Sequence, residues 1–416
     1  MKFLLITNND ADGVGQPAIN LSNNLKKKGY NSKVLVLHKF TKSKDIEQIK
    51  RSLVLRIFLY VLNFLKKDFS ELFGFGYSTI NYNSIAKHVD DADVIIIFTF
   101  YKILSNKMLD KILNKKKIVY FRPLDIEMAA GGCHFNKECE KYKKDCDDCH
   151  KLNFFNISNI TKKHLNEKKI IFERFKPKVF VQNNYVKNIF KKSNIFKNLN
   201  THVLYIGANS SRNVFYTKQF SRETLGIDQN EKIILFGCFN LNSYIKGGHL
   251  LKESLKILKS KLIKNNQRSY LNKIRLITIG NLNNFNLDIP EIKWTHLGLV
   301  NSDKKLNLIY RASDVLVCPS LYCFGPHIVT EALLNDLPVV GFDLGVAQDS
   351  VINGVNGYLV PLYNSQIFAE SIFKTLNKKK IINNDKIMQI KKYCSSEYET
   401  NSVIKFSKAD LTKSQE

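Results

Sequence analysis

The sequence lacks an apolar run long enough to cross a membrane. The nearest run, residues 57–65, has nine residues between Arg56 and Lys66, whereas a spanning helix needs about 20. The opening MKFLLITNND has too short an apolar run for an export signal, because polar residues follow it at once. We therefore expect a cytoplasmic protein whose thiols stay reduced, and we expect no disulfides.

Acidic residues are scarce beside basic ones. The chain has 37 Asp and Glu against 64 Lys and Arg, a formal net charge of +27. Such a surplus suits nucleic acid, an anionic membrane surface or anionic substrates, while a chain rich in Lys, Asn and Ile can also owe it to genome composition. No nucleic-acid-binding motif is present, so we do not expect that partner. Residues 43–67 predict an amphipathic basic helix, either packed in a core or docked on the inner face of the cell membrane.

Repeats and low-complexity tracts are also absent. Short apolar runs typical of buried parallel strands alternate instead with helical patterns. The expected strands are 3–6, 33–37, 94–98, 118–121, 232–237, 275–279, 294–297, 315–318 and 338–340. A chain of 416 residues is long enough for two domains with separate cores. We predict an α/β fold of two Rossmann-like, doubly wound domains facing a cleft.

The most informative stretch is 314–343, DVLVCPSLYCFGPHIVTEALLNDLPVVGFD. It predicts a strand, a loop, a helix from His327 to Leu334, and a second strand. Ligands of open α/β sheets bind at the carboxyl ends of strands, and a helix N-terminus there favours an anion such as a phosphate. Glu331 could accept two hydrogen bonds from the vicinal diol of a ribose. The alternative is that Glu331 only complements the helix dipole.

Half of the eight cysteines fall within 17 residues. They are Cys133, Cys139, Cys146 and Cys149, spaced C-x5-C-x6-C-x2-C. Four thiolates at this spacing can hold one tetrahedral zinc, with His134 or His150 as substitute ligands. An iron–sulfur cluster and unliganded thiols remain alternatives. A metal would explain how so polar a segment keeps its shape.

Residues 319–340 resemble the nucleotide-sugar site of retaining glycosyltransferases of family 4, which have the GT-B fold. The matching positions are Pro319, Ser320, Phe324, Gly325, Glu331, Ala332, Pro338, Val339 and Val340. The resemblance places Glu331 on the donor ribose. It implies further donor contacts from Phe324, Gly325, Pro326, His327 and Ile328. The family's first Glu is absent here, because Cys323 stands eight residues before Glu331, with Tyr322 beside it.

Residues 122–152 resemble an insertion that one branch of the same family carries. The matching positions are Asp125, Gly131, Gly132, Cys133, His134, Cys139, Lys141, Tyr142, Cys146 and Cys149. The His that precedes the family's Asp is Leu124 in this chain. The resemblance implies that Asp125, or Arg122 three residues earlier, reaches the acceptor.

Two further loops resemble family elements. Gly13 and Gly15 occupy a glycine-rich loop that in the family faces the donor diphosphate and the acceptor. Lys246-Gly247 fits the Lys-Gly pair that holds the diphosphate, whereas Asn240 and Leu241 stand where the family has Arg. The alternative for Lys246 is an ordinary solvated lysine.

The resemblance divides the chain into an acceptor domain at 1–200 with the cysteine-rich insertion 125–152, a donor domain at 201–396, and a crossing C-terminal helix and tail at 397–416. It implies metal-independent, retaining transfer of a sugar from a nucleotide-diphospho-sugar to a glycan or lipid-linked acceptor in surface polysaccharide synthesis. The implied catalytic residues are Lys246, Glu331 and Asp125. No catalytic cofactor is expected, and zinc would be structural. The alternative is a catalytically weakened GT-B protein that serves as a binding or scaffold partner.

Overall fold

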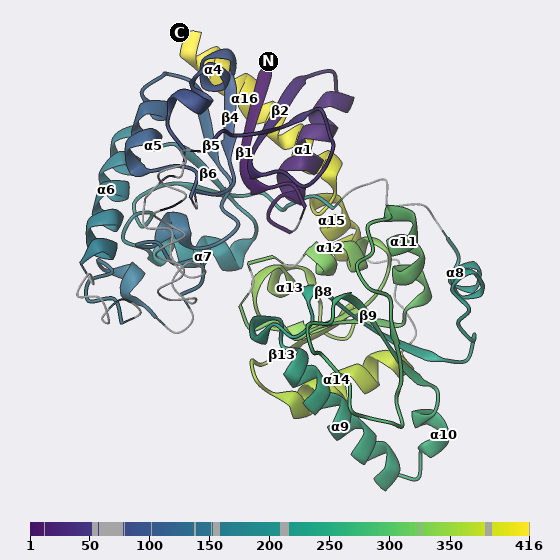
Figure 1. Ribbon diagram of the computed structural model, residues 1–416. Helices are drawn as coiled ribbons and strands as arrows, with labels where there is room; N and C mark the ends of the chain where they lie inside the picture. The colour runs from purple at the N-terminus through teal and green to yellow at the C-terminus, as the bar shows by residue number, and fades with distance from the viewer. Residues whose placement is uncertain are drawn as a thin grey trace. The chain divides into compact units, whose positions relative to one another are not determined.

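The computed structural model describes residues 1–11, 13–51, 57, 78, 80–100, 102–136, 139–150, 152, 159–208, 216–322, 324–325, 327–378 and 385–415. The chain forms two compact units (Figure 1). Unit 1 contains Met1–Tyr205 and Glu399–Glu416, and unit 2 contains Ile206–Tyr398. Each unit is built on its own parallel sheet.

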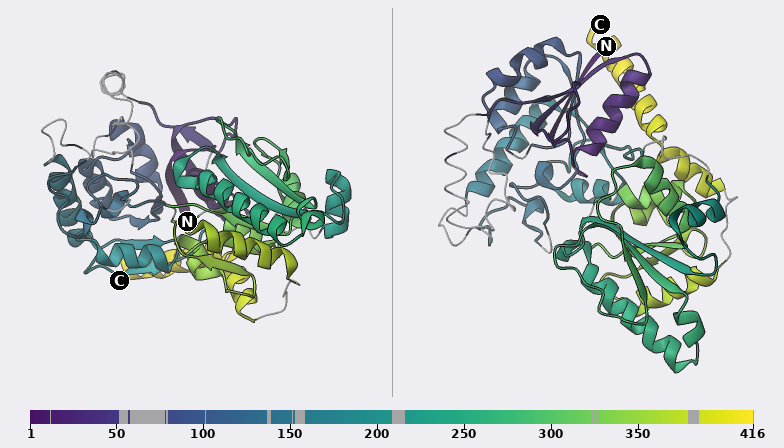
Figure 2. Two further views of the ribbon diagram at one scale, coloured as in Figure 1. Left: turned by 90° about the horizontal axis from the view of Figure 1, so that it is seen from below. Right: turned by 45° about the vertical axis from the view of Figure 1, so that its right-hand side comes forward.

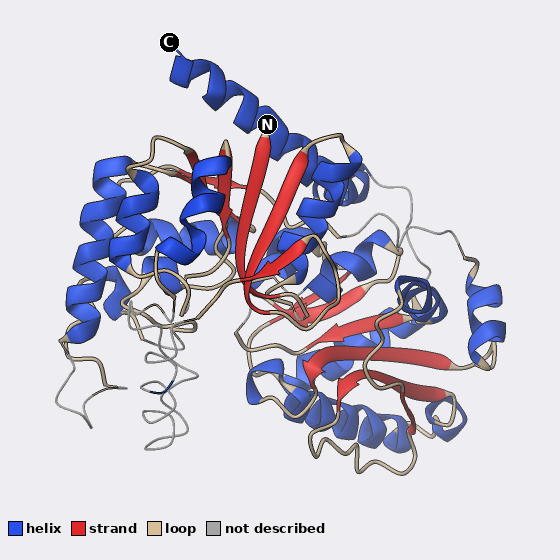
Figure 3. Cartoon of the chain, turned by 45° about the horizontal axis from the view of Figure 1, so that its top comes forward, coloured by secondary structure: helices blue, strands red, loops and turns tan. Residues whose placement is uncertain are grey.

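Unit 1 has a seven-stranded parallel sheet in the order β3-β2-β1-β4-β5-β6-β7 (Figure 3). Its strands are β1 (Lys2–Asn9), β2 (Asn31–His38), β3 (Ile46–Gln48), β4 (Val94–Ile97), β5 (Ile118–Phe121), β6 (Lys178–Val181) and β7 (Thr201–Val203). All four residues of β4 are buried. Continuous apolar strands of this kind are typical of a parallel sheet that helices cover on both faces.

The helices of unit 1 surround this sheet. They are α1 (Gln16–Lys27), α4 (Asn83–Asp91), α5 (Asn106–Leu113), α6 (Ile160–Phe175), α7 (Asn184–Lys192) and most of α16 (Ser396–Gln415), with short 3-10 turns η1 (Glu127–Ala129) and η2 (Lys141–Lys143). Side-chain caps fix two of the starts. Ser105 accepts a hydrogen bond from the Met108 N–H, and Asn183 accepts one from the Val186 N–H.

Unit 2 has a six-stranded parallel sheet in the order β10-β9-β8-β11-β12-β13. The strands are β8 (Lys232–Asn240), β9 (Ile274–Asn281), β10 (Lys293–His296), β11 (Val315–Cys318), β12 (Val339–Phe342) and β13 (Gly357–Val360). The helical elements are α8 (Lys218–Leu225), η5 (Tyr244–Lys246), α9 (Gly248–Lys264), α10 (Arg268–Leu271), α11 (Asp303–Ala312), α12 (His327–Leu334), α13 (Gly345–Ser350), α14 (Ser365–Asn377) and α15 (Asp385–Tyr393). Helices α9 and α14 pack against each other, and α8 packs on α11.

The predicted pair of doubly wound, Rossmann-like domains is confirmed as a fold. Two local predictions were wrong. Ile46–Gln48, expected in a helix, is the edge strand β3, which buries Ile46 and pairs with β2. The strand expected to end at Gly237 continues to Asn240 through an irregularity in its pairing with β9. Of the amphipathic stretch 43–67, residues 52–56 and 58–67 lie outside the described residues. No described helix combines the length and the apolar character that crossing a membrane requires.

Arg122 corrects a third prediction, because it cannot reach an acceptor. Its side chain is fully buried directly after β5. Its Nε donates to Glu399 Oε1 at 2.9 Å, and its Nη2 donates to the same oxygen. The remaining N–H groups donate to the carbonyl oxygens of Phe180, Leu204 and Tyr205 at 3.3, 2.7 and 2.9 Å. Arg122 therefore ties α16 to β5, β6 and the segment after β7.

Further contacts hold α16, drawn in yellow up to the C-terminus in the right-hand view of Figure 2, along the sheet of unit 1. Tyr120 on β5 donates a hydrogen bond to Asp410 at 2.8 Å, and Lys178 on β6 forms an ion pair with the same carboxylate. The ring of Phe406 lies 4.9 Å from that of Phe180. The last helix is therefore part of the core of unit 1.

Glu399→Gln should destabilise the protein strongly. The amide leaves the Arg122 charge buried without its counter-charge, which costs about 3–5 kcal/mol when one partner of a buried pair is removed. The free energy of unfolding from urea titration of the full chain, followed by circular dichroism, would show the loss. Asp91→Asn is the matched control, because Asp91 pairs with Lys2 on the surface and should change little. Equal effects of the two variants would contradict the role given to Arg122.

Candidate functional site

The predicted donor residues of unit 2 lie in loops at the carboxyl edge of its sheet or on α12, which begins there. Strand β8 ends at Asn240, and η5 follows with Lys246 at its end. Strand β11 ends at Cys318, and α12 begins at His327. Phe324 is buried between these elements, and Gly325 is half-buried. Ile328 packs closely on Gly237 of β8. Pro326 lies outside the described residues.

A glycine contact joins the loops after β8 and β11. A Cβ on Gly247 would lie 1.8 Å from the Pro319 carbonyl oxygen, and Gly247 has a left-handed φ of +71°. The Leu321 N–H also donates to Ile245 O at 2.9 Å. Both loops are therefore held together directly beside Lys246. The close approach needs the absence of a side chain at residue 247.

Lys246 stands at the start of α9, where an anion is favoured. Gly247 caps this helix without a side-chain hydrogen bond, and its first turn contains no acidic residue. Helix N-terminal N–H groups and a lysine beside them suit a phosphate. Burial raises the pKa of the neighbouring Cys238 thiol to about 12, while the charge of Lys246 acts in the opposite direction. Lys246 is thus close enough to β8 to influence its last residues electrostatically.

Glu331 has a fixed partner that the sequence did not reveal. The buried hydroxyl of Tyr310, on α11, donates to Glu331 Oε2 at 2.5 Å. Glu331 is the fifth residue of α12, and the first turn of this helix holds no acid. A role limited to complementing the helix dipole is therefore less suitable, since that effect falls off within the first turn. From sequence, Tyr310 predicted only helix packing, because the contact joins two helices 21 residues apart.

Two tyrosines meet near the position where the family has its first Glu. The hydroxyls of Tyr322 and Tyr363 lie 3.4 Å apart. Tyr363 follows β13 and has a left-handed φ of +63°, a conformation that is uncommon outside glycine. Cys323 lies outside the described residues. At this edge, then, neutral phenols are present where the resemblance leads one to look for a carboxylate.

The glycine-rich loop of unit 1 is shaped by its own strand. A Cβ on Gly15 would lie 2.0 Å from the Asn9 carbonyl oxygen, whereas one on Gly13 would meet nothing within 4 Å. The sequence missed the buried Asp10 in the same loop, which accepts hydrogen bonds from the Phe40 N–H at 2.6 Å and from Thr41. Burial opposes ionisation, but these hydrogen bonds hold the pKa of Asp10 below its usual value.

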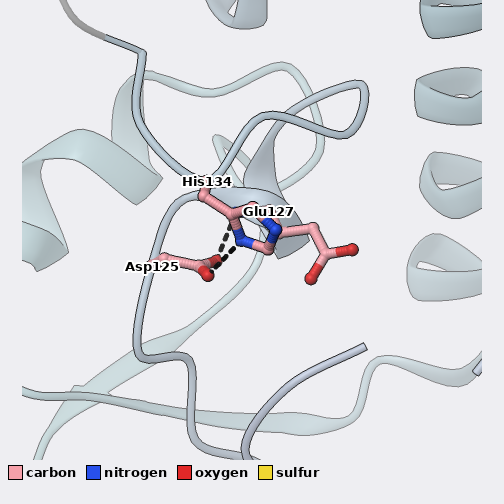
Figure 4. A group of neighbouring side chains, drawn as sticks. All are labelled: Asp125, Glu127 and His134. Carbon is pink, nitrogen blue, oxygen red and sulfur yellow. Dashed lines mark hydrogen bonds and ion pairs between the residues drawn. The ribbon is translucent and has the colours of Figure 1, made fainter. Parts of the chain in front are cut away.

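Asp125 belongs to a cluster with Glu127 and His134 in the cysteine-rich segment (Figure 4). His134 Nδ1 lies 2.6 Å from Asp125 Oδ2, and the Glu127 N–H donates to Asp125 Oδ1 at 2.8 Å. One ligand atom of each residue lies within 4.8 Å of those of the other two. Despite burial, Asp125 raises the pKa of His134 to about 9, while burial raises the pKa of Glu127.

This cluster is balanced by its own charges. Lys168 of α6 is fully buried, and its ammonium donates to the Glu127 carbonyl oxygen at 2.5 Å and to that of Ala130. Two carboxylates therefore face two cationic groups, a protonated His134 and Lys168. A divalent ion would add charge to a neutral group beside a buried ammonium. The arrangement suits an ion network that shapes the loop better than it suits a metal centre.

The four cysteines lie in the same segment without forming a closed set of ligands. Cys133 packs against Cys149 and Leu152, and Cys146 Sγ accepts the Gly131 N–H at 3.3 Å. Burial raises the pKa of the Cys146 thiol to about 11. Among the described residues, the Asp125 cluster is the group whose His, Cys, Asp or Glu atoms meet in a set of three. The zinc site therefore stays a prediction.

Residues 217–393 match the family described as glycosyl transferases group 1. The matched residues lie within unit 2. An uncharacterized glycosyltransferase of Methanocaldococcus jannaschii is 29% identical over 183 residues, which are 41% of this chain and 44% of that protein. The chain thus spans less than half the length of this curated relative.

Solved structures share the whole architecture. Sucrose-phosphate synthase from Thermosynechococcus elongatus has a TM-score of 0.67 at 15% identity, over 99% of this chain and 100% of that one. Anabaena HepE in complex with UDP-glucose has a TM-score of 0.64 at 15% identity, over 98% and 100%. WaaG, a glycosyltransferase involved in lipopolysaccharide biosynthesis, has a TM-score of 0.55 at 12% identity, over 96% of this chain and 95% of that one. At such identities the similarity shows the GT-B fold.

Gly247→Ala should destabilise unit 2 more than Gly226→Ala. Both glycines have a left-handed φ, +71° and +65°, but a Cβ at Gly226 would meet nothing within 4 Å. Alanine at Gly226 should therefore lower the free energy of unfolding only by the cost of holding a residue with a Cβ in the left-handed conformation, about 1–2 kcal/mol. Alanine at Gly247 must also separate the two loops, so its cost should be larger. Thermal unfolding of the full chain measures the difference, and equal shifts in Tm would contradict the loop contact.

Proposed function

We propose that the chain is a retaining glycosyltransferase that uses a nucleotide-diphospho-sugar. The observation that carries this proposal is Glu331, which Tyr310 holds by a 2.5 Å hydrogen bond. It lies on α12, which begins at the same carboxyl edge of the unit 2 sheet as the Lys246–Gly247 turn. A held carboxylate can accept both hydroxyls of a ribose, and an ammonium beside an uncapped helix start can hold a diphosphate. Together these groups would bind the ribose and the diphosphate of a nucleoside diphosphate.

Lys246 is the main positive charge proposed for the leaving diphosphate. Asn240, where the family has Arg, is neutral, and its side-chain oxygen accepts the Asn242 N–H at 3.0 Å. More of the charge that develops on the leaving group would then be stabilised by Lys246 and the N–H groups at the start of α9. This division of work requires no metal ion.

The proposed reaction keeps the configuration at the sugar. The bond between the anomeric carbon and the diphosphate oxygen breaks, and the bond to the acceptor oxygen forms on the same face. The departing phosphate oxygen takes the acceptor proton, so no separate protein base is needed. The protein mainly positions the two substrates and stabilises the diphosphate.

For the acceptor we propose a glycan or a lipid-linked sugar, used in surface polysaccharide synthesis in the cytoplasm. The involvement of WaaG in lipopolysaccharide biosynthesis supports this choice, and the net charge of +27 suits work at an anionic membrane surface. Asp125, 20% exposed, is the acceptor-side residue that we propose. Its ion pair with His134 fixes its orientation.

A second candidate is a catalytically weakened GT-B protein that binds a partner. The changed family positions favour it: Leu124, Asn240 and the Tyr322 site all lack the expected charged or imidazole group. Such a protein could bind the donor but would not turn it over. Donor binding and turnover therefore have to be measured separately.

Glu331→Gln should weaken binding of UDP, the nucleotide that HepE binds, by about 10- to 100-fold, because hydrogen bonds to a charged group contribute about 1.5–3 kcal/mol. Titration calorimetry with UDP, followed by a panel of nucleotide-sugars, measures this effect. The matched control is Glu370→Gln, a half-buried carboxylate that pairs with Lys261, and it should bind as the parent does.

NMR of the product anomer then tests retention. If no nucleoside diphosphate binds, or if Glu331→Gln binds like the parent, the donor site is wrong. Binding without turnover for any acceptor would instead favour the second candidate.

We also propose that Cys133, Cys139, Cys146 and Cys149 hold a structural zinc ion. Elemental analysis of the purified chain should then find about one zinc per chain, the content of a site with four cysteine ligands. Cys146→Ser should remove the metal and lower Tm, whereas Cys394→Ser, a buried cysteine of unit 2, should keep the metal. A zinc-free chain whose stability does not respond to Cys146→Ser would contradict this site.

A further inference from the structure

A pocket of about 400 Å³ lies in unit 2 at the edge opposite the proposed donor site. Lys232 begins β8, Asp314 precedes β11 and Pro338 precedes β12, and all three line the pocket. Because these strands are parallel, the pocket lies at the amino edge of their sheet. Its volume is within the range of small-molecule sites.

The pocket has a surplus of positive charge. Four cationic side chains line it, against two carboxylates. Asp314 is already paired with Lys218 and Arg222. Asp336 is already paired with Arg311 and Lys391. The acids are thus neutralised by their own partners.

Lys232 and Lys378 supply the remaining positive charge. The Lys232 ammonium donates to the Leu376 carbonyl oxygen at 3.1 Å, and that of Lys378 donates to the Gly354 carbonyl oxygen. Each of these contacts uses one of the three N–H groups of an ammonium. Carbonyl oxygens carry no net charge, so both lysines keep their charge for a ligand. A small anion would neutralise it.

Asn335 adds a second requirement on the ligand. Its side chain is 2% exposed, it lines the pocket, and its Oδ1 has no hydrogen-bond partner. The amide orientation is fixed because Nδ2 donates to the Glu331 carbonyl oxygen at 2.9 Å. A buried acceptor without a partner costs about 1–3 kcal/mol. A ligand hydroxyl that displaces the atoms covering this oxygen would satisfy it.

We propose that this pocket binds a small phosphate ester with hydroxyl groups, of the sugar phosphate class. The phosphate would lie between Lys232 and Lys378, and a hydroxyl would donate to Asn335. This site is separate from the carboxyl edge, where Lys246 lies and α12 begins.

The pocket is also connected to Glu331 through α12. The Asn335 N–H and side-chain amide both donate to the Glu331 carbonyl oxygen, at 3.2 and 2.9 Å. Arg311, which lines the pocket, directly follows Tyr310, the partner of the Glu331 carboxylate. A ligand at Asn335 would therefore change the affinity of the donor site, and by linkage a donor would change the affinity of the pocket. This coupling rests on the proposed function, whereas binding in the pocket does not.

Calorimetry on the full chain with glucose 6-phosphate tests the site, with inorganic phosphate and glucose as comparison ligands. We expect the ester to bind several-fold more tightly than phosphate, and glucose not to bind. Lys232→Gln and Lys378→Gln should each lower the affinity for the ester by about tenfold or more, since each removes a charged hydrogen-bond donor. Lys374→Gln, an exposed lysine of α14 outside the pocket, is the matched control and should change nothing. Circular dichroism checks that the variants fold.

Lys246→Gln separates this site from the donor site. It should leave the affinity for glucose 6-phosphate unchanged while it lowers the affinity for UDP. If Lys246→Gln removes ester binding and Lys232→Gln does not, the ester occupies the carboxyl edge and the proposal is wrong. It is equally wrong if phosphate binds as tightly as the ester or if no ester binds. A failure of UDP binding alone would refute the donor site and leave the pocket standing.

Discussion

Unit 1 depends on the buried ion pair between the Arg122 guanidinium and the Glu399 carboxylate. The guanidinium is a fixed charge that cannot be neutralised by losing a proton, and it is fully buried. A charge in that position is tolerable only if every N–H group finds an acceptor and a counter-charge lies beside it. The carbonyl oxygens come from β6 and the segment after β7, and the counter-charge comes from Glu399, 277 residues away. The N-terminal sheet is therefore incomplete without α16.

The elements that the sequence predicted well are those that local pattern determines. A continuous apolar run such as β1, β4 or β11 predicts a buried strand whatever its neighbours are. The helix at His327–Leu334 follows from the spacing of its apolar residues. Strand β3 was missed because three residues with one buried side chain have no periodicity of their own, and the neighbour β2 decides their conformation. Arg122 was misread because an arginine after a strand has the same appearance whether it faces a substrate or a distant carboxylate.

The candidate site likewise combines residues that local sequence predicts with partners that only the fold brings together. Motif spacing indicated Glu331, Lys246 and the glycine beside it, since these belong to local turns. The partners that make them usable could not be read from spacing. Tyr310 reaches Glu331 from another helix, and Gly247 matters because the Pro319 carbonyl oxygen passes over it. Asp10, which ties two loops of unit 1, was missed for the same reason.

Helix α12 gives unit 2 two chemically distinct ends. Its start faces the carboxyl edge, with the Lys246 turn, and its end leads into Asn335 at the amino edge. Because a protein interior is close-packed and transmits strain, a displacement at one end of α12 would be felt by its neighbours.

The pairing of Arg122 with Glu399 also fixes an order of events on the ribosome. Residues 206–398 contain every strand of the second sheet, so that unit can collapse as soon as it has emerged. The first unit is synthesised earlier but lacks its counter-charge until the final helix leaves the exit tunnel. Until then the earlier half cannot bury Arg122 and complete its core, and nascent chains halted before Glu399 should depend on holding factors that shield exposed apolar surface.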